Sequence, residues 1–412
     1  MNAVPRSPTA PPRRRSAGRI ELIILTGAAV VRIALLSCAE SRPERFEFPD
    51  SRRYLKVARN FADGKGLIEA PNLRAGTDPV YPMILAAGIG LGAESDAAVY
   101  RFARIVNAAF SCITVIMGMR MARRLWGQRP AMFVGIVLAL DPILLYFNAL
   151  VLTETVFITL LLAAIACVVN GPQGRPVLRA ACAGALLAVA TLTRSTSLLI
   201  PLTLAPFVWS GVRAPDWRRR ALPVAVMLAS WAVVMLPWVV RNVRVFDRLV
   251  VVRTGGGASL LEAFGPWADG GPGMQRVQFP PVAPDADEVD RDRVYRAAAF
   301  QWIRQNPAAA VSLSLRKALR TWSPLLHAPD HTSAFYQAIS VMTVVPIYFL
   351  AALGAWRQRR HRRLVALLLV PAAYFTLVHM VFVGSVRYRL PAVAAMICLA
   401  GAVFATRRRG PA

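Results

Sequence analysis

Apolar segments of helical length recur along most of the chain, and short basic stretches separate them. A helix of about 20 apolar residues is long enough to cross the hydrocarbon core of a bilayer. The pattern predicts an all-α integral membrane protein with about ten transmembrane helices, with a break at residues 193–195 between the fifth span and the sixth. The ten segments are residues 20–38, 99–120, 131–148, 154–170, 178–193, 196–212, 221–240, 336–356, 364–383 and 391–406.

A further apolar stretch, residues 81–92, is too short for a span and suits an interfacial or re-entrant segment. If it does not cross, every short basic loop and both termini fall on the same side of the membrane. That side then carries 23 basic residues and only two acids, Glu21 and Asp216. The positive-inside rule makes this face cytoplasmic. We therefore predict a multi-pass protein of the cytoplasmic membrane with both termini inside.

The two long polar segments, residues 39–98 and 241–335, then lie on the outer side. Each contains nine of the 22 acidic residues, and we expect external chemistry to be housed there. From Asp50 onward, apolar residues recur at helical spacing as far as Phe61, and Gly64 ends the run. This pattern predicts an amphipathic helix that lies on the membrane surface.

The ends of the chain differ in composition from the part between them. Residues 1–18 are rich in Pro, Ser and Arg, which predicts a disordered cytoplasmic tail. The apolar run that follows resembles a signal peptide, but Arg32 interrupts it and no clean small-residue cleavage site follows. We therefore expect an uncleaved anchor, a transmembrane domain at residues 19–406 and a short cytoplasmic tail at 407–412.

Composition agrees with a membrane protein and excludes other classes. The chain has 412 residues, of which 56% are hydrophobic and 17% charged, with a mean hydropathy of +0.46. Soluble domains have about 25% charged residues. The net charge of +27 follows from the basic cytoplasmic loops, so it does not indicate a nucleic-acid partner. The five cysteines lie in or at the edges of apolar segments, which argues against a disulfide framework.

Three carboxylates near the membrane are candidates for chemistry. Asp50 follows Pro49 at the start of the interfacial helix, where it is either a helix cap or a general base or metal ligand. Glu154 lies at the outer end of the 154–170 span, where it is either solvated or functional. Asp141 precedes Pro142 inside a span and could cap the second half of a broken helix.

Four arginines stand at outer ends of spans, a location that the positive-inside rule disfavours. A phosphate on the outer face would explain them, because a guanidinium matches phosphate oxygens. The alternative is that they snorkel to lipid headgroups. The four are Arg194, Arg241, Arg387 and Arg389, and the tyrosines proposed for substrate contact are Tyr54, Tyr81 and Tyr388.

A series of short motifs, in a fixed order, resembles the GT-C glycosyltransferases of the protein-mannosyltransferase and aminoarabinose-transferase type. The motifs are PDSRRYLKVARNFADGKGL, DPVYPMILAAGIGLG, LALDPILLYFNALVLTETVF, ATLTRSTSLLIP, PWVVRNVRVF, IRQNPAAAVSLSLRKALR and VRYRLP. They extend from about residue 20 to residue 405.

The resemblance implies that a hexose or pentose moves from a polyprenyl-phosphate donor to a glycan, lipid or protein acceptor on the outer face. It makes Asp50 the catalytic acid of the first loop and Glu154 the acid of the second outer loop, and it implies that the outer arginines meet the donor phosphate. The family often has two adjacent acids in the first loop, whereas Ser51 follows Asp50 here. A divalent metal on Asp50 and Glu154 is the only cofactor left open.

Three other functions compete with this interpretation. A transporter predicts ionisable residues at mid-membrane and a repeated half, but only Arg32 and Asp141 lie there and no internal repeat is evident. A membrane scaffold would not need Asp50 or Glu154. A polysaccharide ligase or polymerase that uses a diphosphate-linked donor would have the same composition.

Overall fold

The computed structural model describes the whole chain except residues 1–12, 43–45, 170–174, 213–214, 329–331 and 406–412. Its regular elements are helices, and no strand occurs in the described part. The α-helices are α1 (Arg13–Ser41), α2 (Pro49–Ala62), α3 (Val80–Gly90), α4 (Asp96–Trp126), α5 (Gln128–Leu140), α6 (Pro142–Ala149), α7 (Glu154–Val169), α8 (Pro176–Thr193), α9 (Ile200–Gly211), α10 (Trp217–Phe246), α11 (Gly256–Ala263), α12 (Glu288–Gln305), α13 (Pro307–Trp322), α14 (Ala334–Arg357), α15 (Arg362–Val381) and α16 (Leu390–Gly401).

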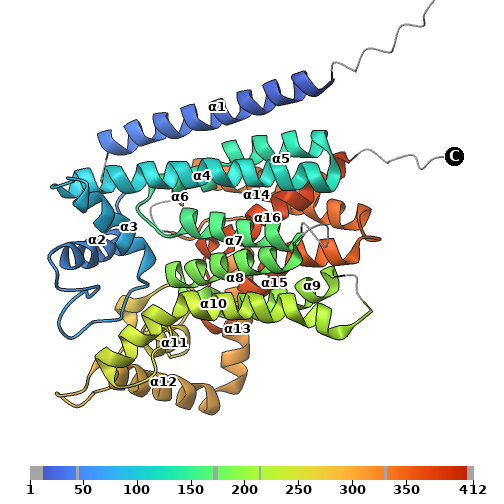
Figure 1. Cartoon of the computed structure of the whole chain (residues 1–412). Coiled ribbons are helices and arrows are strands. Elements are labelled where there is room, and N and C mark those ends of the chain that lie inside the picture. Colours follow the sequence, from blue (N-terminus) through green and yellow to red (C-terminus); the bar gives the residue numbers. More distant parts are fainter. Residues whose placement is uncertain (1–12, 43–45, 170–174, 213–214, 329–331, 406–412) are drawn as a thin grey trace, which may run out of the picture.

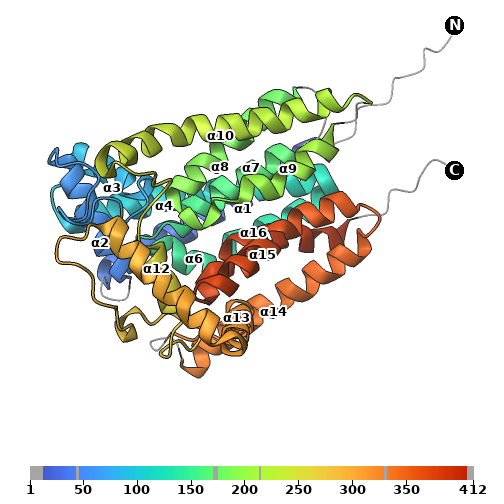
Figure 2. The same cartoon turned by 90° about the horizontal axis from the view of Figure 1, so that it is seen from below.

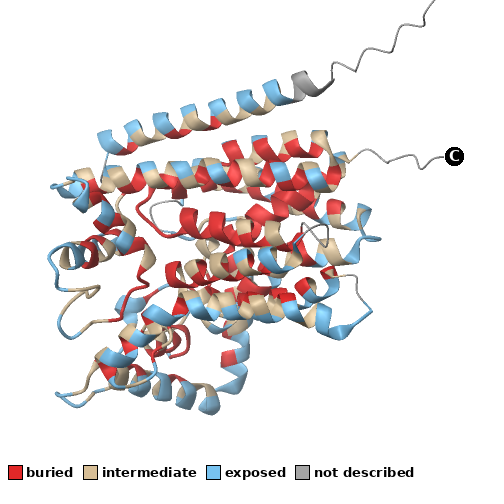
Figure 3. Ribbon diagram, in the orientation of Figure 1, coloured by how far each residue is buried: buried red, intermediate tan, exposed pale blue. Residues whose placement is uncertain are grey.

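The long helices run side by side as one bundle (Figure 1). The short helices α2, α3, α11 and α12 gather at one end, whereas the start of α1 and the end of α16 lie at the other (Figures 1 and 2). Buried residues concentrate on α7 and α16 at the centre (Figure 3). The α16 span is 78% buried, against 22% for α1 and for α10. The outer helices therefore keep their apolar side chains exposed for lipid contact.

The structure confirms the all-α membrane fold and contains a helix in each of the ten predicted segments. In the described part of the chain, seven helices are long and apolar enough to span a membrane, and the bent pair α5 and α6 would make an eighth. The other two, α7 and α9, have 16 and 12 residues, so the count of ten crossings stays a prediction. The stretch that we expected not to cross forms α3, of 11 residues.

The N-terminal prediction needs one correction. The helix α1 begins at Arg13, inside the segment 1–18 that we expected to be disordered. The remainder of that segment, residues 1–12, and the whole of the predicted C-terminal tail, residues 407–412, lie outside the described residues.

The break between α5 and α6 is built around Asp141. The two helices bend by 48°, and the Asp141 carboxylate accepts hydrogen bonds of 2.9 Å from the backbone N–H groups of Ile143 and Leu144. The predicted cap is thus confirmed. Because Pro142 has no N–H, it cannot bond the carbonyl of Leu138, four residues earlier.

Arg32 of α1 supplies the missing donors at this break. Its guanidinium is buried and donates to the carbonyls of Leu138 (3.3 Å) and Ala139 (3.1 Å), and its Nε donates to Ser111 (2.9 Å). A charged group inside a membrane bundle is tolerated only when it is satisfied in this way. Arg32 therefore fastens α1 to the rest of the bundle.

The helix α2 forms where the interfacial helix was predicted, and it ends before Gly64, which has a φ of 76°. Its position at the membrane surface stays a prediction. Its start differs from our expectation. Phe48 is the N-cap, Pro49 is the first helical residue and Asp50 is the second, and the cap residue makes no side-chain hydrogen bond. The helix-cap explanation of Asp50 is therefore wrong.

The second outer loop folds onto the bundle through α13. Lys317 is fully buried, lies 3.4 Å from the centre of the Phe264 ring and donates to the carbonyls of Met380 (3.4 Å) and Val381 (3.3 Å) at the end of α15. Burial lowers the pKa of Lys317 to about 7.

This pKa predicts that stability rises with pH. Between about pH 7 and the ordinary lysine pKa of 10.5, the unfolded chain binds a proton that the folded chain has released, so raising the pH favours the fold. We expect the apparent melting temperature in detergent to rise between pH 7 and pH 9, and Lys317→Met to reduce that rise. If the melting temperature of Lys317→Met rises with pH as steeply as that of the wild type, the rise does not come from Lys317. Lys65→Met, which replaces an exposed lysine, is the control and should keep the wild-type rise.

Close packing of α8 on α10 depends on Gly184. A Cβ there would lie 2.1 Å from the carbonyl oxygen of Met227, whereas a Cβ on Gly90 would meet nothing within 4 Å. We expect Gly184→Ala to destabilise the fold by about 1–3 kcal/mol and Gly90→Ala to cause no loss. Thermal unfolding in detergent measures both, and equal melting temperatures would show that the two helices separate freely.

Candidate functional site

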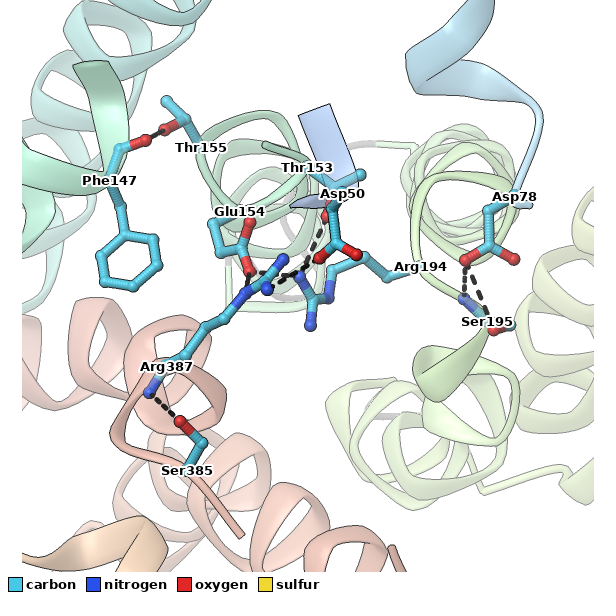
Figure 4. A network of polar contacts seen from close by, with 10 residues as sticks. All are labelled: Asp50, Asp78, Phe147, Thr153, Glu154, Thr155, Arg194, Ser195, Ser385 and Arg387. Atoms are coloured by element: carbon cyan, nitrogen blue, oxygen red, sulfur yellow. Dashed lines mark hydrogen bonds and ion pairs between the residues drawn. The ribbon is translucent and has the colours of Figure 1, made fainter. Parts of the chain in front are cut away.

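Four charged side chains from distant parts of the chain meet at the end of the bundle that holds α2 (Figures 1 and 4). Asp50 comes from α2 and Glu154 from the first residue of α7. Arg194 follows α8, and Arg387 lies in a 3-10 turn, η5 (Val386–Arg389). Two carboxylates and two guanidinium groups give this cluster no net charge.

Glu154 is the centre of the cluster. It is 1% exposed, and its Oε1 accepts from Nη1 of Arg194 (2.5 Å) and from Nε of Arg387. Its Oε2 is buried without a hydrogen-bond partner among the described residues. A carboxylate at a helix N-terminus is stabilised by the helix dipole, but one this deeply buried also needs paired cations. Glu154 therefore fixes the two arginines.

Arg387 joins the two carboxylates. Its Nη1 donates to Oδ2 of Asp50 at 2.9 Å while its Nε donates to Glu154, and its guanidinium lies 5.7 Å from the centre of the Phe48 ring. The fork geometry of arginine allows both contacts at once. The α2 helix and the η5 turn are thus connected through one side chain.

The backbone of the preceding loop positions Arg387. The N–H of Gly384 donates to the carbonyl of Gly270 (2.8 Å), and a Cβ on Gly384 would lie 2.4 Å from the carbonyl oxygen of Lys317. Only a glycine allows this close approach. The second outer loop therefore holds the turn that carries Arg387.

The two carboxylates differ in access. The Asp50 side chain is 41% exposed, whereas Glu154 is enclosed. Asp50 can therefore reach a bound molecule directly, and Glu154 acts through the arginines it holds.

The three predicted tyrosines occupy different places. Tyr54 lies one turn after Asp50, and its ring packs edge-on against Tyr81 at 5.3 Å. Tyr81 is fully buried, with its hydroxyl accepting from Nδ2 of Asn107 at 3.2 Å, so it supports Tyr54 from the core. Tyr388 stacks on His379 at 4.1 Å and lies 5.9 Å from the guanidinium of Arg194.

Two of the four predicted arginines lie apart from the cluster. Arg241 rests on the Trp238 ring at 4.8 Å and donates to Oδ1 of Asn242 (2.9 Å) and to the carbonyl of Leu67 (3.4 Å). Arg389 is completely buried and donates to the carbonyl of Ser323. Its Nε and Nη2 have no hydrogen-bond partner among the described residues.

Asp78 is a carboxylate that our sequence reasoning did not select. It is buried, and its Oδ2 accepts from the N–H (3.1 Å) and the hydroxyl (3.4 Å) of Ser195. Burial raises the pKa of Asp78, while Arg253 and the Ser195 hydrogen bonds oppose that rise. Figure 4 shows it on the far side of the Arg194 turn from Glu154. The sequence signal that could have identified Asp78 is its place directly before Pro79.

Asp50 and Glu154 were also the predicted ligands of a possible divalent metal. In the structure, the guanidinium of Arg387 bonds both carboxylates. No group of three His, Cys, Asp or Glu residues in the described part of the chain could hold a metal ion. The divalent metal on Asp50 and Glu154 stays a prediction.

Comparison with known proteins bears on the fold. Residues 76–240 match the family model of the dolichyl-phosphate-mannose-protein mannosyltransferases. The oligosaccharyltransferase of Archaeoglobus fulgidus in its apo form aligns over 92% of this chain with a TM-score of 0.58 and 13% identity. The chain therefore shares the fold of this oligosaccharyltransferase over most of its length. The GT-C resemblance seen in the motifs is thereby confirmed.

Other comparisons define the extent of the GT-C likeness. The A. fulgidus oligosaccharyltransferase AglB in complex with an inhibitory peptide and a dolichol-phosphate aligns over 92% of this chain with a TM-score of 0.55 and 13% identity. The chain spans about half the length of both A. fulgidus structures (50%).

ArnT from Cupriavidus metallidurans bound to undecaprenyl phosphate has 18% identity to this chain. The alignment covers 94% of this chain and 77% of the ArnT chain, with a TM-score of 0.42. No curated protein sequence is significantly similar to the chain.

Proposed function

We propose that this GT-C protein is a glycosyltransferase that moves a sugar from a polyprenyl-phosphate donor to an acceptor on the outer face of the cytoplasmic membrane. The observation that carries the proposal is the joining of Asp50 and Glu154 by Arg387 next to the interfacial helix α2. A reachable carboxylate beside arginines suits transfer from a phosphate leaving group. The dolichol-phosphate held by AglB supports a lipid-linked donor.

Asp50 would act as the general base. An acceptor hydroxyl or amine is a weak nucleophile, and removal of its proton as it attacks lowers the barrier. The acceptor atom forms a bond to the anomeric carbon, and the bond from that carbon to the phosphate oxygen breaks. Attack from the face opposite the phosphate inverts the configuration at the anomeric carbon, which analysis of the product anomer would test.

The arginines would stabilise the leaving group. As the bond breaks, negative charge grows on the phosphate oxygens, and preorganised guanidinium donors stabilise that charge. Arg387 and Arg194 are held for this by Glu154. The driving force is stored in the donor bond, so no nucleotide is needed.

The orientation in the membrane follows from charge. The end of the bundle opposite α2 holds the start of α1 and the end of α16 (Figure 1), and the predicted cytoplasmic side carries 23 basic residues. The positive-inside rule places that end in the cytoplasm. Gly90 in α3 is exposed, and an added Cβ there meets nothing within 4 Å. We expect a cysteine at this position, Gly90→Cys, to be reachable by a thiol reagent from outside and not from the cytoplasm, with labelling of inverted and right-side-out vesicles as the measurement.

The direct test is a transfer assay. The purified protein is mixed with labelled polyprenyl-phosphate sugars, both hexoses and pentoses, and a membrane extract as acceptor source. Transfer from a monophosphate donor supports the proposal and identifies the sugar class. Transfer only from a diphosphate-linked oligosaccharide would favour a ligase or polymerase, and movement of intact donor across the membrane without transfer would favour a transporter.

A further inference from the structure

A charged cavity lies near the outer end of the bundle, beside the reaction site. It has a volume of about 600 Å³ and is lined by residues near the end of α1, along α2 and at the start of α4, among them Leu55 and Tyr100. This volume is in the range of small-ligand pockets. The helix α2 forms part of its wall. Because α2 is expected to lie on the membrane surface, we place the cavity at the level of the lipid headgroups.

Charge pairing leaves the cavity positive. Each of its three acids pairs with one lining arginine. The remaining two lining cations, Lys56 and Arg104, have no ion-pair partner among the described residues. Arg104 is 4% exposed, and its Nε donates to the carbonyl of Ala149 at 3.0 Å. The three pairs are Arg52 with Glu47, Arg59 with Asp96 and Arg101 with Glu40.

We propose that this cavity binds the phosphomonoester headgroup of the spent carrier lipid, a polyprenyl phosphate, after sugar transfer; this rests on the proposed function. The donor is a phosphodiester with one negative charge. When the sugar leaves, the phosphate becomes a monoester with about −1.5 to −2 charges. Two unpaired cations match that dianion, and the match is better than for the donor or for an ordinary diester phospholipid.

The geometry gives the lipid a short path. The same helix carries Asp50 at its N-terminus and Lys56 less than two turns later. The α4 helix below Arg101 exposes Ile105 (52%) and Ile113 (42%), so an apolar tail can remain in lipid while its headgroup lies in the cavity. Removal of the product from the reaction site leaves Arg387 free for the next donor.

Binding of matched lipids tests this site without any transfer. The full-length protein is titrated with a polyprenyl phosphate and with its methyl ester, a phosphodiester with the same tail, and bound lipids are counted by native mass spectrometry. We expect the wild type to bind two monoesters, one at the reaction site and one in the cavity. The cavity should prefer the monoester to the methyl ester by at least about tenfold, as expected for one added charge-assisted contact.

Lys56→Glu is the decisive variant because Lys56 is exposed and its replacement does not disturb the core. It should reduce the count to one monoester, whereas Lys65→Glu, an exposed lysine paired with Asp63 outside the cavity, should leave two. Two monoesters bound with unchanged affinity in Lys56→Glu would overturn the proposal. Equal competition by phosphatidylglycerol would overturn the carrier assignment, because it would show a general headgroup site.

The two proposals fail in different ways. Suppose that the wild type transfers no sugar, while Lys56→Glu binds one monoester fewer than the wild type. That result would contradict the proposed function and support the phosphate site. If the wild type transfers sugar and Lys56→Glu binds the same number of lipids as the wild type, only the cavity proposal is contradicted.

Discussion

Asp50→Asn should lower the rate of sugar transfer by at least about 100-fold while the protein stays folded. The amide keeps the shape of the side chain and can still accept a hydrogen bond from Arg387, but it cannot take a proton from the acceptor. Because Asp50 is 41% exposed and only the second residue of α2, the substitution leaves the core intact. Transfer of labelled sugar under single-turnover conditions measures the loss.

Asp63→Asn is the matched control for Asp50→Asn. Asp63 caps the other end of α2, pairs with Lys65 at 2.9 Å and is exposed, so its amide should transfer sugar at the wild-type rate. If Asp50→Asn also transfers within about threefold of wild type, well short of the usual contribution of a general base, Asp50 is not the base.

Arg387→Ala should lower transfer by about 10²–10³-fold, the effect of removing one preorganised donor from the developing charge. It should also lower the melting temperature, because Glu154 is buried and loses one of its two cations. Rate and thermal unfolding are measured on the same preparation. The pair of losses distinguishes Arg387 from a residue that acts on chemistry alone.

Arg387→Lys separates the two effects. Lysine restores a positive charge beside Glu154, so stability should largely recover, but it cannot bond two partners as the planar fork does, so transfer should stay low. Arg276→Ala, which removes an exposed outer arginine paired with Asp269, should change neither. Full transfer by Arg387→Lys would mean that charge alone suffices.

Hydropathy and charge predicted the helices and the important charges well. Each apolar segment contains a helix because burial in lipid demands satisfied backbone groups. The break at Asp141 followed from one acid before a proline. Asp50 and Glu154 were selected as carboxylates near the membrane that the family resemblance also marks. Arg194 and Arg387 were selected because the positive-inside rule disfavours arginine at outer span ends. The structure brings these four together.

The direction of each side chain could not be predicted in the same way. Arg387 meets Glu154 from 233 residues away in the sequence, and that contact depends on how α7 and η5 pack. Arg241 and Arg389 also stand at span ends, yet neither joins the cluster. Arg241 rests on the Trp238 ring, and Arg389 is buried and donates to the carbonyl of Ser323. Asp78 was missed because it matters through its hydrogen bonds to Ser195. Only the fold brings these two residues together.

The contact of Arg32 with the broken helix has a consequence for biosynthesis. Arg32 is made early, but the carbonyls that satisfy it belong to residues 106 and 107 positions later. At a synthesis rate of about 5–20 residues per second, the interval is roughly 5–20 s. During that time an unsatisfied arginine in the bilayer costs about 2.5–3.5 kcal/mol.

Until α5 emerges, the nascent α1 therefore lacks two of the acceptors that its arginine has in the folded bundle. Docking of α1 is thus a late step, completed only when the Asp141 break has formed.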